Sequence, residues 1–137
     1  MIVDQDEWLD MDQLELWPED MTMTEYGAQA MEHCIYPDST LYPVLGLLSE
    51  AGEVADKLKK HFRDGEGVEE VSCQDAVVEL PLELREGLAL ELGDCLFYIT
   101  AIASDIGYDL EEIAAMNLEK LEDRSERNVL KGSGDYR

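Results

Sequence analysis

The sequence predicts an all-α protein in which four helices form a structure like a four-helix bundle. Apolar residues recur at helical spacing over four segments, and Gly, Pro and capping residues separate these segments. Two of the segments are long enough to pack side by side in antiparallel order. At 137 residues, the chain is most simply one domain with room for a hydrophobic core.

The first 20 residues differ in composition from the rest of the chain, because they contain eight acidic residues and no basic one. We interpret residues 1–20 as an acidic N-terminal extension. Residues 21–137 then form the folded domain, and its last ten residues, 128–137, form a tail rich in glycine and charge. We expect no dedicated role for the two tryptophans of the extension.

The first predicted helix runs from about Thr24 to Cys34, with Thr22 or Thr24 as its N-cap and Pro37 beyond its end. The second begins near Pro43 and continues to about Phe62. Residues 64–81 follow, and their DGEG motif and mixed acidic sequence indicate a loop with a short helical turn.

The third predicted helix runs from about Leu82 to Ile106 and ends at Gly107, a residue suited to the left-handed C′ position. Asp109 and Glu112 have the spacing of a capping box. They open a fourth helix that continues to about Arg127.

The second and third helices each carry two carboxylates three residues apart within apolar sequence. They are Glu50 and Glu53 in LLSEAGEVADKL, and Glu91 and Asp94 in LALELGDCLFYI. Residues at this spacing share one helix face, so four carboxylates converge if the two helices pack together. Such a cluster requires a compensating cation, and oxygen ligands without His or Cys favour Mg²⁺ or Mn²⁺. The alternative is that these acids occupy a solvated helix face.

The charge of the chain limits its partners. With 33 acidic and 10 basic residues, its formal net charge of −23 should repel nucleic acid polymers and anionic membranes. The basic residues are clustered after the carboxylate segments, which is compatible with a small anionic ligand. No secretory signal and no apolar stretch of about 20 residues is evident, and three cysteines without metal-ligand spacing suggest reduced thiols. We therefore expect a cytoplasmic protein.

Several motifs together resemble a known family. EAGEVADKLKK followed by ELGDCLFYI resembles the MazG-like members of the all-α nucleoside triphosphate pyrophosphohydrolases. NLEKLEDR resembles the fourth-helix signature of that family, and GSGDYR resembles the tail of short, often phage-encoded members. The resemblance covers roughly Thr24 to Arg137. Ser49 is a departure, because several relatives carry a further glutamate at this position.

The resemblance implies an all-α NTP pyrophosphatase fold that dimerises or tetramerises through its helices. It implies Mg²⁺-dependent cleavage between the α- and β-phosphates, with Mn²⁺ as a substitute ion. Glu50, Glu53, Glu91 and Asp94 would form the catalytic metal site.

Further residues are candidates for binding the substrate. Asn117 and Lys120 would meet phosphate or sugar with Arg124 as a helper, and Asp135 and Arg137 would complete a site, perhaps on a neighbouring subunit. Lys60 and Arg63 are candidates for phosphate contacts, and Tyr98 lies one turn after Asp94. Each has a simpler explanation: the basic residues can pair with nearby acids, and tyrosines at helical spacing often belong to the core.

The predicted function is therefore Mg²⁺-dependent hydrolysis of an NTP or dNTP to the monophosphate and pyrophosphate in the host cytoplasm, with a preference for deoxynucleotides, possibly purines. Two alternatives remain open. The charge of −23 is also typical of an acidic interaction protein that mimics nucleic acid. Ser49 leaves room for a regulator that binds metal and nucleotide without turnover.

Overall fold

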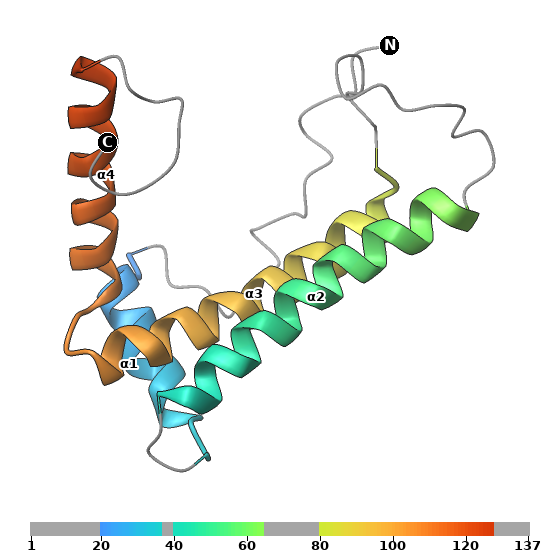
Figure 1. Ribbon diagram of the computed structural model, residues 1–137. Coiled ribbons are helices and arrows are strands. Elements are labelled where there is room, and N and C mark those ends of the chain that lie inside the picture. Colours follow the sequence, from blue (N-terminus) through green and yellow to red (C-terminus); the bar gives the residue numbers. More distant parts are fainter. Residues whose placement is uncertain (1–19, 37–39, 65–79, 128–137) are drawn as a thin grey trace.

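A computed structural model of the protein describes residues 20–36, 40–64 and 80–127, and these residues form four helices without a strand. The helices are α1 (Met23–Glu32), α2 (Leu41–Asp64), α3 (Leu82–Asp105) and α4 (Leu110–Glu126), as Figure 1 shows. The all-α prediction is confirmed. Most of the predicted acidic extension, the loop after α2 and the C-terminal tail lie outside the described residues.

Local side-chain chemistry explains where α1 and α4 begin. The Glu25 N–H donates to the Thr22 hydroxyl oxygen at 3.1 Å, and the Thr22 N–H donates to the Glu25 carboxylate at 2.8 Å. Asp109 and Glu112 form the same reciprocal pair at the start of α4, at 2.8 and 2.9 Å. Both capping boxes satisfy N–H groups that have no partner within the helix.

Gly107 ends α3 in the left-handed conformation, with φ of +83°. Its N–H donates to the Ser104 carbonyl at 3.1 Å, and the Tyr108 N–H donates to the Ala103 carbonyl at 3.0 Å. This pattern is the Schellman motif, in which glycine avoids the steric penalty of a Cβ atom. It turns the chain sharply from α3 into α4.

The helices α2 and α3 form a long antiparallel pair, and α1 packs against α3 near one end of this pair (Figure 1). The last helix, α4, contacts α1 and α3 but has no contact with α2. Figure 1 shows α4 extending away from the pair after its first turns. A single chain therefore does not close the four helices around one common core.

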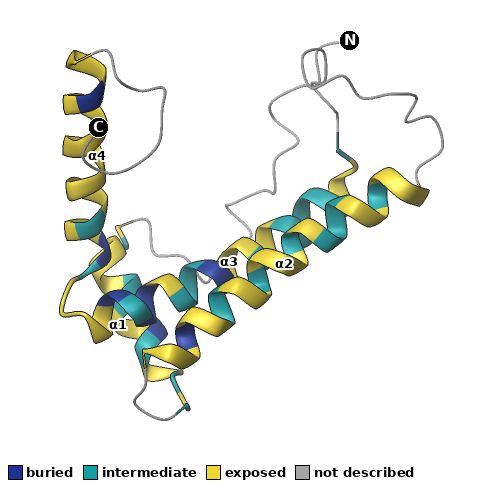
Figure 2. Cartoon of the chain, in the orientation of Figure 1, coloured by how far each residue is buried: buried dark blue, intermediate teal, exposed yellow. Residues whose placement is uncertain are grey.

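Most buried residues of the described chain gather near the contact of α1 with α3 (Figure 2). Most are small, which allows the helix backbones to approach closely; they include Ala30, Cys95, Ala101 and Ala103. By contrast, large apolar side chains of α2 are exposed at Leu41, Leu45 and Leu48, with exposed fractions of 56–66%. These three share one helix face, which no other described helix covers.

The helix α3 is, among the described residues, the one helix long and apolar enough by composition to cross a membrane. This corrects the expectation that no segment approaches that length. The criterion is weak for a single helix, and Glu91 and Asp94 lie near the middle of α3. The contact of α3 with α2 explains part of its apolar composition, while Leu90 and Leu92 on the same helix are exposed.

A close approach between α2 and α3 occurs at Gly46. An ideal Cβ atom on Gly46 would lie 2.4 Å from the Tyr98 ring, closer than real Cβ contacts allow. The absence of a side chain at Gly46 therefore makes space for the ring and sets the separation of the two helices.

We predict that Gly46→Ala destabilises the protein by about 1–3 kcal/mol, because the Tyr98 ring must move to admit the new methyl group. Gly52→Ala on the same helix is the matched control. No atom lies within 4 Å of its ideal Cβ, so alanine should be neutral or stabilise the helix by up to about 1 kcal/mol. Urea denaturation followed by circular dichroism measures both. Equal stability of the two variants would contradict the close approach.

Candidate metal centre

Three carboxylates from two helices meet at the contact between α2 and α3. Glu50 lies on α2, while Glu91 and Asp94 lie one turn apart on α3. One carboxylate oxygen from each residue lies within 4.8 Å of the other two. Glu50 and Glu91 are half-buried and Asp94 is exposed, so the group opens to solvent on one side.

Glu53, the fourth predicted ligand, has a different position. It is exposed on α2, and the group of three convergent oxygens does not include it. Its negative charge nevertheless contributes to the raised pKa of Glu50, so it lies in the electrostatic neighbourhood of the cluster. The structure thus places Glu53 at the edge of the site.

The cluster carries excess negative charge. Partial burial raises the pKa of the Glu50 carboxyl, and the nearby charges of Asp94, Glu53 and Glu91 raise it further. The buried Cys95 thiol beside the cluster has a raised pKa for the same two reasons, burial first and carboxylate charge second. Cys95 is therefore held in its neutral form and packs as a small apolar side chain.

The donor set fits a hard divalent cation. Carboxylate oxygens are the preferred protein ligands of Mg²⁺, which typically takes one or two carboxylates and completes its shell with water and substrate phosphate. Three oxygens that share one side of the α2–α3 contact provide such a partial shell. A cation there would also offset the repulsion that raises the pKa of Glu50.

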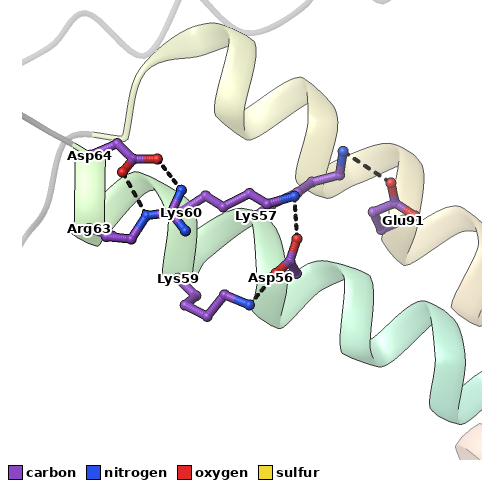
Figure 3. A network of polar contacts seen from close by, with 7 residues as sticks. All are labelled: Asp56, Lys57, Lys59, Lys60, Arg63, Asp64 and Glu91. Atoms are coloured by element: carbon purple, nitrogen blue, oxygen red, sulfur yellow. Dashed lines mark hydrogen bonds and ion pairs between the residues drawn. The ribbon is translucent and has the colours of Figure 1, made fainter.

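Lys57 reaches this cluster from α2, as Figure 3 shows. Its ammonium lies 3.1 Å from Oε1 of Glu91 on α3. The sequence analysis assigned no role in the site to Lys57. Its spacing contains a signal, however, because it follows Glu53 by four residues and Glu50 by seven and thus shares their helix face.

The neighbouring basic residues of α2 have local partners. Lys59 and Lys60 both pair with Asp56, and these contacts lower the pKa of Asp56 to about 2. Arg63 donates through Nε to Asp64 at 2.6 Å. Lys60 and Arg63 were predicted to contact phosphate, but here each pairs with an acid of its own helix (Figure 3).

The predicted phosphate-binding residues on α4 lie away from the carboxylates. Asn117 and Lys120 line a pocket of about 400 Å³, together with Tyr108 and apolar residues of the α3–α4 corner and α4. No carboxylate of the cluster lines this pocket, and α4 does not contact α2. Arg124 is buried on the same helix. Asp135 and Arg137 lie outside the described residues.

Tyr98 belongs to a group of stacked tyrosines next to the cluster. Its ring centroid lies 6.4 Å from that of Tyr36, which in turn stacks on Tyr42 at 4.5 Å. Burial raises the pKa of the Tyr98 hydroxyl, and Tyr42, Glu50 and Asp94 raise it further. Because the ring also occupies the space beside Gly46, Tyr98 connects helix packing with the carboxylate site.

Comparisons with known proteins identify the family of this chain. The MazG nucleotide pyrophosphohydrolase domain matches residues 39–129, which include both carboxylate segments and all of α4. The chain is similar to the Gene 37 protein of Mycobacterium phage L5, with 35% identity over 120 residues that cover 82% of this chain and 96% of the phage protein. No solved structure matches. The chain belongs to the MazG nucleotide pyrophosphohydrolase family.

Proposed function

We propose that this protein hydrolyses a nucleoside triphosphate, with a preference for purine deoxynucleotides, to the monophosphate and pyrophosphate. The observation that supports this proposal is the convergence of Glu50, Glu91 and Asp94 in a member of the MazG family. We further propose that Mg²⁺, or Mn²⁺ in its place, is required and that the reaction takes place in the host cytoplasm.

The roles of the carboxylates follow from their positions. Glu50, Glu91 and Asp94 would hold the ion from two helices, and Glu53 would approach from the edge of the cluster. The ion would supply positive charge to the phosphate oxygens and favour ionisation of the attacking water. In-line attack on the α-phosphorus releases pyrophosphate as the leaving group. This reaction requires charge compensation, because the triphosphate and the departing pyrophosphate are both anionic.

A second copy of the chain would complete the site. The residues expected to meet phosphate or sugar, Asn117 and Lys120, lie on a helix that does not contact α2 within the chain. The face formed by Leu41, Leu45 and Leu48 is exposed, as expected for a surface that another subunit covers. We therefore propose that a neighbouring subunit brings its α4 to the carboxylate cluster.

We predict that the protein releases pyrophosphate and a monophosphate from at least one common NTP or dNTP, in the presence of Mg²⁺ or Mn²⁺. Glu53→Ala, Asp94→Asn and Glu91→Gln should each lower kcat by a factor of about 100 or more, because each weakens the metal site. Product separation by ion-exchange chromatography distinguishes this cleavage from release of inorganic phosphate.

Glu83→Gln is the matched control for these variants, because Glu83 is an exposed carboxylate in the first turn of the same helix as Glu91. Its activity should remain near that of the wild type. A folded protein that binds nucleotide but gives no product under single-turnover conditions would favour the alternative of a non-catalytic regulator.

We predict that Glu50→Gln stabilises the metal-free protein at neutral pH, by about 1–3 °C in Tm. The raised pKa means that ionised Glu50 opposes folding above its folded pKa, and that this effect vanishes below its unfolded pKa. The advantage of the glutamine variant should therefore be present at pH 7 and be lost as the pH falls towards 4. Calorimetry with a chelator present measures the Tm of wild type and variant at pH 7 and near pH 4. A variant with a lower Tm than wild type at pH 7 would contradict the inference that ionised Glu50 is repelled by its neighbours.

We predict that the subunits complement one another. Mixing and reassembling Glu91→Gln and Lys120→Ala chains, each with little activity alone, should restore about a quarter of wild-type activity, because mixed dimers carry one intact site. If Lys120 served the carboxylates of its own chain, the mixture would show no gain in activity.

We predict that Leu45→Glu shifts the sedimentation coefficient towards that of a single chain, because Leu45 lies on the exposed α2 face.

A further inference from the structure

Lys57 connects the two helices that carry the carboxylates. It arises from α2, and its ammonium contacts Glu91 of α3 at 3.1 Å. Its side chain passes over Gly87, one turn before Glu91, where an ideal Cβ would lie 3.7 Å from the Lys57 Nζ and Cδ atoms. The lysine stem therefore lies at van der Waals distance from α3 along the helix interface.

The environment of this pair makes the contact energetically relevant. The Glu91 side chain is 14% exposed and that of Lys57 is 37% exposed, so water screens the contact less than it screens a surface pair. Lys59 differs, because it pairs with Asp56 of its own helix and its side chain is 66% exposed. Lys57 therefore supplies positive charge directly to one of the three convergent carboxylates, while Lys59 does not.

We propose that Lys57 is a resident counter-ion of the carboxylate cluster, and that a divalent cation must displace its ammonium from Glu91 in order to bind. This inference rests on the metal site in the proposed function. One oxygen of Glu91 belongs to the metal-binding group, while the Lys57 ammonium contacts the same carboxylate. The ammonium and a divalent cation repel one another at such short range, so they compete for the cluster.

Displacement has a consequence for the substrate. Once Glu91 turns to the metal, the ammonium of Lys57 remains at the edge of the site without its carboxylate partner. A phosphate group that enters the site is an anion and can accept hydrogen bonds from this ammonium. Nucleotide binding would thus relieve the competition, and metal and nucleotide would each strengthen the binding of the other.

The test measures Mn²⁺ affinity of the full chain without nucleotide, from the electron paramagnetic resonance signal of free Mn²⁺. Lys57→Met should bind Mn²⁺ about tenfold more tightly than the wild type, because the competing charge is gone. Lys57→Arg should bind as the wild type does, since it retains the charge. Lys59→Met, which removes an equal charge on the same helix, should change affinity by less than about twofold.

A second measurement separates competition from a purely structural role. In a chelator, Lys57→Met should unfold at a lower temperature than wild type, because Glu91 loses its partner. At saturating Mn²⁺ this difference should disappear, because tighter binding gives the variant a larger stabilisation by the metal. If Lys57 only connected the helices, the variant would remain less stable at all Mn²⁺ concentrations.

Unchanged or weaker Mn²⁺ binding by Lys57→Met overturns this proposal and leaves the hydrolytic function intact. Absence of Mn²⁺ binding by the wild type overturns both the counter-ion role and the metal centre. Tighter binding by Lys57→Met in a protein that hydrolyses no NTP supports the counter-ion role and overturns only the proposed activity.

Discussion

Repulsion among carboxylates at the α2–α3 contact is the constraint on which the rest of this structure depends. Glu50 faces Glu91 and Asp94 across the contact; burial raises the pKa of Glu50, and the charges of these neighbours raise it further. The same two helices also hold the Tyr98 ring against Gly46, so apolar packing fixes the distance at which the charges meet. A bound cation would offset this repulsion, and Lys57 offsets only part of it because it contacts only Glu91 of these three carboxylates.

The distribution of basic side chains explains why a metal suits this site. On α2, the acids of the same helix already engage Lys59, Lys60 and Arg63. An incoming triphosphate would have to compete with those acids for their positive charge. A divalent ion and the displaced ammonium of Lys57 would supply positive charge without this competition, which supports the proposal that the site attracts a polyanion only when a cation is bound.

The described residues of one chain do not form a full core around this site. Small buried residues gather near the contact of α1 with α3, whereas the α2 face at Leu41, Leu45 and Leu48 is exposed. The helix α4 leaves the pair after the Schellman turn at Gly107 and never contacts α2. The exposed apolar face and the separate helix with candidate substrate-binding residues both support the proposal that a second subunit completes the site.

The sequence by itself determined the features that depend on local interactions. The capping boxes at Thr22 and Asp109, the glycine turn at Gly107 and the spacing of the carboxylates on each helix involve residues within one or two turns, so they could be predicted. Only the tertiary structure decided that Glu53 lies outside the group of three convergent oxygens and that Lys57 contacts Glu91. Both depend on the rotation and register of α2 against α3, which arise from side-chain packing between residues distant in the sequence.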